Sequence, residues 1–360
     1  MPAPHAVAEP LHALVFSAFP HITHELYPLM VDACVAAPAL RVVGVHVDWL
    51  HKGRVTRAIT YDVERDLLVE APLAETVVPT TAQVLGLNLC HEHADHRRIA
   101  AELPGTRLLN PPAGAALLDD KARTAACWQR VNLDTPAFAA YPADLVAFVA
   151  ENGSRIVIKP GDGTEGRAVG IFDLHQPVQR AAAFRHLDEL GANALVTVER
   201  GTVRACTDKG PVRCVIRINV CWDGARAWAE SGYAQLAGSQ GIASAGRGGR
   251  VIALSDLWRR LCREDGTPLT PSPGDWRCLL ATAENGTRAL AGELDGTMPA
   301  LIGLDLLLDV ANNDSLLPIL LEANPRPSGM ARCTLLTANT PTGDPGIAPH
   351  LWPCIVARLA

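Results

Sequence analysis

The sequence has 360 residues, a formal net charge of −6 and 48% hydrophobic residues, so it can bury the cores of two or three lobes. It contains no dense run of Lys and Arg, and no apolar run reaches the ~18 residues of a membrane-spanning helix. Residues 1–10 hold prolines and charges where a secretory signal would be apolar, and the ten cysteines lack CxxC spacing. We therefore expect a cytoplasmic protein with free thiols that binds neither nucleic acid nor membrane.

The N-terminal segment alternates strands and helices. Apolar runs at 11–19 and 41–48 predict strands, and a helical pattern at 24–37 lies between them. This order predicts a parallel, Rossmann-like first lobe. A further helix is predicted at 95–103, where Pro104 ends it.

Three histidines, His91, His93 and His96, lie at the start of that last helix. Their spacing differs from that of a zinc-binding helix, and no partner cluster occurs elsewhere in the sequence. Of two interpretations, a metal site and a polar helix start near a substrate cleft, the sequence favours the second.

A small α+β lobe is predicted next. Strands at 155–159 and 167–173 flank a glycine-rich loop, whose backbone N–H groups can approach an anion closely. Lys159 ends the first strand, in a chain where arginine is the default cation. A lysine retained there hints at a phosphate contact, with chance as the alternative. Helices are predicted at 120–131, 142–151 and 176–190, and a strand at 194–199 leads to the last lobe.

The last lobe carries two arginines in an apolar strand predicted at 211–224. Arg213 and Arg217 lie four residues apart and hence on one face. Buried guanidinium groups are costly unless they are paired or bind anions, so this face indicates ion pairs or an anion site. Residues 255–275, which are rich in proline, indicate an inserted surface loop.

A hairpin near the C-terminus carries the most informative side chains. Apolar stretches at 300–309 and from residue 320 onward are joined by turn residues at 311–314. Asp305 lies on the first strand, and Glu322 and Asn324 share a face of the second because they are two residues apart. Hard oxygen ligands grouped in this way suit Mg²⁺. The alternative is a solvated edge hairpin.

Three segments together resemble the ATP-grasp superfamily and, within it, the glutathione synthetase-like ligases. They are KPGDGTEG (159–166), GLDLLLD (303–309) and LEANPRP (321–327). In addition, RLLNPPAGAALLDDKART (107–124) is similar to the start of the ATP-binding region, and ASAGRGG (243–249) is similar to a substrate lid. The resemblance covers roughly residues 105–335.

The resemblance implies a three-lobed ATP-grasp fold that combines α/β and α+β architecture. Its lobes would be a Rossmann-like substrate lobe at 1–118, a small ATP-grasp lobe at 119–193 and a C-terminal lobe with hairpin and lid at 194–360. ATP would bind with two Mg²⁺ ions, for which Mn²⁺ is the alternative. The implied metal ligands are Asp305, Glu322 and Asn324, the implied catalytic residues are Arg217 and Arg247, and the implied ATP-binding residues are Lys121, Lys159, Gly161, Asp162, Gly163, Gly166, Thr197 and Glu199.

The implied activity is a ligation in which ATP phosphorylates a small-molecule carboxylate and an amine then displaces phosphate. The chain departs from glutathione synthetases in substrate territory, because 229–235 lacks an expected arginine and 326–330 lacks the Thr- and Ser-rich pattern. An ATP-grasp kinase acting on a hydroxyl is the alternative enzyme. A catalytically weak nucleotide-binding module is disfavoured by the retained lysines and metal positions. The family also allows a homo-oligomer.

Overall fold

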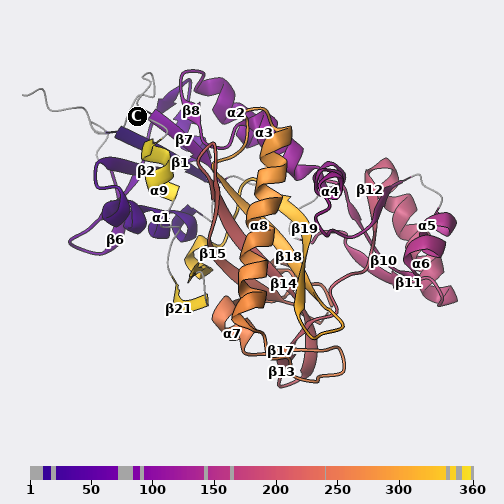
Figure 1. The fold of residues 1–360 in the computed structure, drawn as a ribbon. Helices are drawn as coiled ribbons and strands as arrows, with labels where there is room; N and C mark the ends of the chain where they lie inside the picture. The colour runs from indigo at the N-terminus through magenta and orange to yellow at the C-terminus, as the bar shows by residue number, and fades with distance from the viewer. Residues whose placement is uncertain are drawn as a thin grey trace, which may run out of the picture.

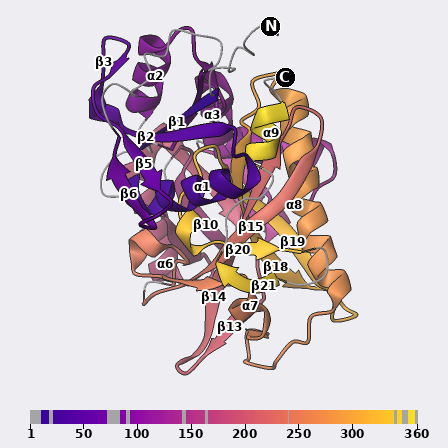
Figure 2. The same ribbon diagram turned by 90° about the vertical axis from the view of Figure 1, so that its left-hand side faces the viewer.

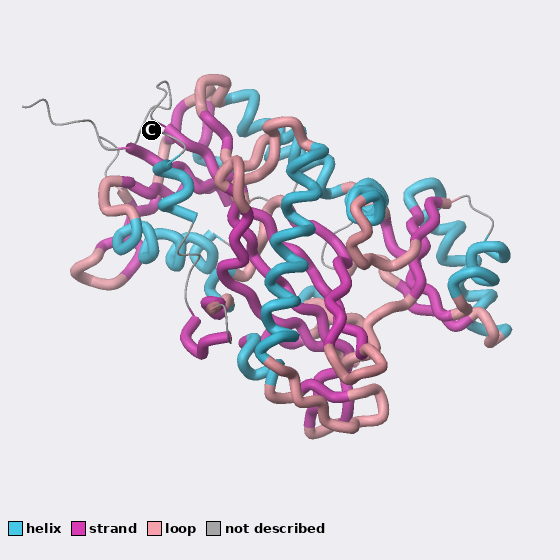
Figure 3. The backbone as a smooth tube through the Cα atoms, viewed as in Figure 1, coloured by secondary structure: helices cyan, strands magenta, loops and turns pink. Residues whose placement is uncertain are grey.

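Three β-sheets, each with its own helices, form the body of the protein in the computed structural model (Figure 1). The structure describes residues 11–17, 22–71, 84–89, 93–141, 145–162, 166–239, 241–337, 341–345 and 351–357. The order of the elements along the chain agrees with the mixed α/β architecture expected from the sequence. Figure 3 shows the long strands of the largest sheet at the centre, between the other two units.

The N-terminal sheet has the order β6-β5-β2-β1-β7-β8. Strands β1, β2, β7 and β8 pair in parallel, as the predicted Rossmann-like lobe requires, whereas β5 and β6 add an antiparallel hairpin at one edge. The elements are β1 (Leu11–Ser17), α1 (Ile22–Ala36), β2 (Leu40–His46), η1 (Val47–Trp49), β3 (Leu50–His51), β4 (Arg54–Val55), β5 (Ile59–Asp62), β6 (Leu67–Glu70), β7 (Val84–Asn88), α2 (His93–Glu102), β8 (Arg107–Leu108) and α3 (Pro112–Asp119).

The second sheet is antiparallel, with the order β11-β10-β12-β9. Its apolar face packs on two helices around Ile156, Ile158 and Leu187, while the opposite face turns toward the largest sheet. Strand β12 belongs to this sheet, although the proposed lobe boundary falls just before it. The elements are α4 (Lys121–Arg130), β9 (Phe138–Ala140), α5 (Leu145–Asn152), β10 (Arg155–Pro160), β11 (Gly170–Asp173), α6 (Pro177–Leu190), η3 (Gly191–Asn193) and β12 (Ala194–Val198).

The largest sheet is antiparallel, and helix α8 covers one of its faces (Figure 1). Trp276, Leu279 and Ala283 of this helix are fully buried against the sheet. With one face covered by α8, the other can line a site. The elements are β13 (Arg204–Thr207), β14 (Gly210–Trp222), β15 (Ala227–Leu236), η4 (Ala245–Arg247), β16 (Arg250–Ala253), α7 (Leu254–Trp258), β17 (Leu261–Cys262), α8 (Pro273–Glu293), β18 (Leu301–Val310), β19 (Leu316–Asn324), η5 (Met330–Arg332), β20 (Thr334–Leu336) and β21 (Pro341–Pro345).

The C-terminal helix α9 (Leu351–Ala357) returns to the N-terminal unit, beside α1 (Figure 2). Trp352 is fully buried there, and its indole Nε1 donates a hydrogen bond of 2.8 Å to the carbonyl oxygen of Leu29. The two ends of the described chain therefore share one core.

The prediction of a surface loop at 255–275 is correct for 263–272, which lie in no named helix or strand and contain no buried residue, and wrong for the residues on either side. Helix α7 and strand β17 occupy its first part, at 255–258 and 261–262, and Leu257 and Leu261 are buried. Of the prolines that indicated a loop, Pro268 and Pro271 lie in this irregular stretch, whereas Pro273 begins α8, where Ser272 and Asp275 form a capping box.

No helix in the described ranges is both long enough and apolar enough to cross a membrane. The cysteines in those ranges are free thiols, as their spacing predicted.

Candidate functional site

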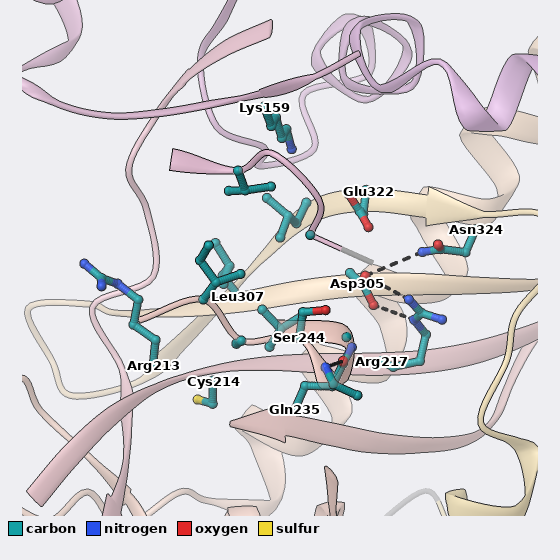
Figure 4. Close-up of a pocket in the computed structure, with 18 of the residues that line it drawn as sticks. Lys159, Arg213, Cys214, Arg217, Gln235, Ser244, Asp305, Leu307, Glu322 and Asn324 are labelled. Atoms are coloured by element: carbon teal, nitrogen blue, oxygen red, sulfur yellow. Dashed lines mark hydrogen bonds and ion pairs between the residues drawn. The ribbon is translucent and has the colours of Figure 1, made fainter. Parts of the chain in front are cut away.

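A cavity of about 630 Å³ lies between the second sheet and the uncovered face of the largest sheet. Its lining contains Lys121, Lys159, Arg217, Asp305 and Glu322, which the sequence predicted separately. Figure 4 shows Lys159 above the hairpin, with Glu322, Asp305 and Arg217 below it in succession. The fold therefore brings together residues up to about 200 positions apart in the sequence.

The predicted hairpin is formed by β18 and β19, and it supplies the acidic residues. Asp305 pairs directly with Glu322 across the hairpin, Arg217 of β14 pairs with Asp305, and Tyr233 of β15 pairs with Arg217. These four residues form a transverse row across four adjacent strands. Directly opposite residues lie on the same face, so the pairing register alone sets the row along the cavity wall. Strand β19 lies at the sheet edge, but Asp305 is only 5% exposed, which argues against a solvated hairpin.

Arg217 and Asp305 form a buried, bidentate ion pair. Arg217 Nε lies 2.5 Å from Asp305 Oδ1, and Arg217 Nη2 lies 2.9 Å from Asp305 Oδ2. The Arg217 guanidinium also lies 5.8 Å from the centre of the Tyr233 ring. Asn324 Nδ2 approaches the same Asp305 Oδ2 at 3.5 Å. Both partners of the pair are thus held in one orientation.

The two carboxyl groups of the hairpin differ in their acidity. Burial raises the pKa of Asp305 to about 6, against the opposing effect of Arg217, and the charge of Glu322 contributes to the rise. Burial also acts to raise the pKa of Glu322, but Lys121, Lys159 and Arg217 outweigh it, and this pKa is lowered. Near neutral pH, Glu322 is therefore the more readily ionised of the two.

The two predicted lysines enter the cavity from the second sheet and from helix α4. Both are buried, and burial lowers the pKa of Lys159, with Lys121 adding to the effect and Glu322 opposing it. The Lys121 backbone N–H donates to the carbonyl oxygen of Gly161 (3.1 Å), and Asn193 Nδ2 donates to Asp162 Oδ1 (2.8 Å). The first turn of the glycine-rich loop is thereby tied to the lysine-bearing helix.

The far side of this loop meets the predicted lid. A Cβ placed on Gly166 would lie 3.2 Å from Ser244 Cβ and 3.3 Å from Ile242 Cγ2. Gly166 has a φ of +66°, so glycine is favoured there both by conformation and by contact. Gly163 lies outside the described residues.

An apolar slot continues from the lysines, between Val157 and Ile171 of the second sheet and Leu307 and Leu321 of the hairpin. Thr197, a predicted nucleotide contact, is buried at its edge. An apolar lining of this kind suits the base of a nucleotide.

Glu199, the other predicted contact at this end, accepts hydrogen bonds from Arg155 of the second sheet (Nε to Oε2, 2.7 Å) and from Arg213 of the largest sheet. Glu199 therefore links the two sheets behind the slot. Arg213 and Arg217 share a face, as predicted, but have different partners.

The lid arginine does not line the main cavity. Ser244, Ala245 and Gly246 of the lid line it, whereas Arg247 lines a smaller adjoining cavity together with Arg213 and Glu199. Arg247 Nε is buried without a hydrogen-bond partner in the described part of the chain.

The end of the cavity near the N-terminal unit contains groups that the sequence did not point to. Glu25 of α1 accepts backbone N–H bonds from Gly329 (2.6 Å) and Met330 (3.0 Å), and Arg326 Nη2 lies 2.7 Å from Asp119 Oδ2. Arg332, which lines the same end, is exposed. These residues lie next to the hairpin. In the sequence, the departure of residues 326–330 from the Thr- and Ser-rich pattern of glutathione synthetases was the signal that could have indicated them.

His96 of the histidine cluster lies in this neighbourhood. Nε2 of the buried His96 lies 2.7 Å from the carbonyl oxygen of Asn110, and its Nδ1 lies 3.4 Å from Arg326 Nη1. The described part of the chain contains no group of three His, Cys, Asp or Glu side chains that could hold a metal. His96 therefore lies beside Arg326, and the interpretation of the cluster as a polar helix start near a substrate cleft stays a prediction.

The hairpin residues nevertheless fit Mg²⁺ by donor type. Glu322, Asp305 and Asn324 supply carboxylate and amide oxygens in one corner of the cavity, and Mg²⁺ commonly takes one or two carboxylates and completes its shell with water and phosphate. Of these three candidate metal ligands, Asp305 also forms an ion pair with Arg217.

No protein-family model matches the sequence, and no curated protein matches it. The structure is similar to D-cycloserine synthetase DcsG (TM-score 0.55, 14% identity, covering 97% of this chain and 100% of that chain). It is also similar to the D-alanine–D-alanine ligase from Coxiella burnetii (0.53, 11%, 97% and 94%) and to a RimK domain ATP-grasp protein from Sphaerobacter thermophilus (0.50, 16%, 88% and 92%). The full-length match to these structures agrees with the motifs, and the chain therefore has the ATP-grasp fold.

Proposed function

We propose that this protein is an ATP- and Mg²⁺-dependent ligase that joins a small-molecule carboxylate to an amine through an acyl phosphate. The observation that carries the proposal is the cavity in which two buried lysines face two hairpin carboxylates. The names of the similar structures, a D-cycloserine synthetase and a D-alanine–D-alanine ligase, support the ligase class over the kinase alternative.

Lys121 and Lys159 would bind the phosphates of ATP, with the base in the slot between Val157 and Leu307. Phosphoryl transfer depends on positioning and on neutralised charge more than on covalent help, and both lysines are held by burial in one corner. Mg²⁺, when bound beside Glu322 and Asn324, would offset the negative charge of the phosphates.

The reaction would then run in two steps. The γ-phosphoryl group moves from ATP to an oxygen of the acid, releasing ADP. The amine attacks the carbonyl carbon, phosphate leaves, and the amine proton passes to solvent. Water would hydrolyse the acyl phosphate, so the lid over the cavity, including Arg247, would serve to exclude it.

The acid and the amine would bind at the end of the cavity formed by Glu25, Arg326 and Arg332. These groups present both signs of charge near the hairpin carboxylates. Arg326 is neutralised by Asp119, which leaves the exposed Arg332 as the more available cation for a substrate carboxylate.

The proposal is tested by incubating the protein with ATP, Mg²⁺ and pools of amino acids and hydroxy acids. We expect ADP and free phosphate in equal amounts, a condensation product in the mass spectrum, and a hydroxamate when hydroxylamine replaces the amine. ADP with a phosphorylated metabolite and no free phosphate would indicate the kinase instead. Absence of ADP formation with every pool would contradict both activities.

A further inference from the structure

The buried Arg217–Asp305 pair changes what the hairpin can offer to a metal. The Arg217 guanidinium engages both oxygens of Asp305, and the two side chains are 8% and 7% exposed. Two-metal sites hold their ions about 3.5–4 Å apart and clamp the attacking and leaving oxygens between them. Here one of the two available carboxylates already has a cation against both of its oxygens.

Gly303 explains how Arg217 reaches this place. It lies two residues before Asp305 on β18, and a Cβ at this position would lie 2.8 Å from Arg217 Cδ and 3.0 Å from Pro327 Cβ. Only the absence of a side chain leaves a channel for the arginine along the sheet. Tyr233 closes the other side of the guanidinium. The cation is thus a fixed part of the wall.

Glu322 has a different setting. It faces Lys121 and Lys159 across the cavity, and no described side chain holds it in a bidentate pair. The charges of the corner are those of Asp305 and Glu322 against Lys121, Lys159 and Arg217, which is two negative against three positive. The corner is already cationic on balance before any metal ion enters.

We propose that this centre takes a single Mg²⁺ with the nucleotide, held on the Glu322 and Asn324 side, and that the Arg217 guanidinium takes the place of a second ion beside Asp305. The inference rests on the proposed function, because it concerns the same nucleotide site. It replaces the two ions expected from the family resemblance. Arg217 is then a positioning residue that fixes Asp305 and supplies a permanent positive charge.

The test counts ions directly, without turnover. Mn²⁺ is titrated into the full chain saturated with the non-hydrolysable β,γ-methylene analogue of ATP, and electron paramagnetic resonance measures free Mn²⁺ and spin–spin coupling. We expect one tightly bound Mn²⁺ per chain with no coupling. In Arg217→Met we expect a second bound ion and a coupled spectrum, because Asp305 loses its guanidinium.

Gly303→Ala gives the same test while keeping the arginine. The added methyl group displaces Arg217 from Asp305, so this variant should also gain a second ion. Arg213→Met is the matched control, since Arg213 lies on the same face of the same strand but pairs with Glu199, and its count should remain one.

Two coupled ions in the wild-type protein would overturn the inference and leave the proposed ligase activity standing. A count of one in both Arg217→Met and Gly303→Ala, with both variants folded by circular dichroism, would also overturn it. Failure of the wild-type protein to bind the nucleotide analogue at all would instead contradict the proposed function.

Discussion

The two ends of the cavity are built in different ways. At the hairpin end, Tyr233, Arg217, Asp305 and Glu322 come from adjacent strands, and the pairing register of the sheet places them in one row. At the adjacent end near α1, Glu25 holds the turn at Gly329 by hydrogen bonds between groups 304 and 305 positions apart in the sequence. One end is set by regular secondary structure, and the other by tertiary docking of a helix on a turn.

This structural difference fits different binding roles for the two ends of the cavity. The hairpin end would handle phosphate and metal, whose chemistry is the same for any substrate, and a sheet keeps such groups in fixed positions. The end near α1 would handle the acid and the amine, and turns can change without disturbing the sheet. Variants at the two ends should therefore affect different kinetic constants.

The largest effect is expected at the hairpin. Glu322→Gln removes the carboxylate that faces both lysines, and we expect turnover to fall by about 10²–10³-fold or more, the cost of losing a preorganised electrostatic group. Circular dichroism and urea unfolding should show an unchanged fold, because Glu322 is only half-buried. Asp314→Asn, in the exposed turn of the same hairpin, is the control and should keep full activity. Unchanged turnover of Glu322→Gln at saturating Mg²⁺ would refute the assignment.

Asp305→Ala separates catalysis from stability at this end. The substitution leaves the Arg217 charge buried without its partner, which typically costs about 3–5 kcal/mol of unfolding free energy. Urea titration of Asp305→Ala and Glu322→Gln side by side measures the contrast. Equal stability of the two variants would mean that the Arg217 pair is not a structural part of the wall.

The next largest effect concerns the nucleotide. Lys159→Met removes a buried cation that would bind phosphate, and a charge-assisted hydrogen bond is worth about 1.5–3 kcal/mol. We therefore expect ATP to bind about 10–150-fold more weakly by calorimetry. Lys209→Met, at an exposed turn between β13 and β14, should bind ATP as the wild type does. Equal affinities for ATP in all three proteins would contradict the role of Lys159.

The hairpin end could be predicted from the sequence because its signals are local. Two apolar stretches joined by turn residues predict the hairpin, and Asp305 and Glu322 then stand out as polar residues in apolar strands. The partner of Asp305 could not be predicted in this way. Arg217 lies 88 positions away, and only the order of the strands in the sheet brings the two together.

The end near α1 and helix α8 were missed for two different reasons. Glu25 sits in an ordinary helical pattern, and its contact with Gly329 spans most of the chain, so no local signal exists. Helix α8 did have a signal, because Ser272 and Asp275 match a capping box with Pro273 at the first helical position. The neighbouring prolines favoured a loop in the prediction, but the residues that follow them form a helix that extends to Glu293.

At the end near α1, Glu25→Gln should raise the KM of the acid or the amine about tenfold and leave ATP affinity unchanged. Glutamine can accept one of the two backbone N–H bonds, but its NH₂ group would face the other, so a charged hydrogen bond worth at least about 1.5 kcal/mol is lost. Steady-state kinetics with each substrate varied in turn provides the measurement. Glu70→Gln, in an exposed ion pair of the same unit, is the control. A rise confined to the KM of ATP would contradict the assignment of the acid and the amine to the end near α1.

The smallest effect, and the one that links the two ends, is expected in the lid. Arg247 Cγ lies 3.5 Å from where a Cβ on Gly166 would be, and Arg247 lines the adjoining cavity, so it is positioned to respond when a ligand fills the main one. Arg247→Ala should lower kcat or raise the KM of the acid a few-fold while ATP affinity stays nearly constant. It should also increase the ratio of ADP released to product formed, because water then reaches the acyl phosphate. Arg250→Ala, an exposed arginine three residues further on, is the matched control. Wild-type kinetics and an unchanged ratio in Arg247→Ala would mean that the lid arginine has no part in closing the cavity, and that the backbone of Ser244, Ala245 and Gly246 covers it alone.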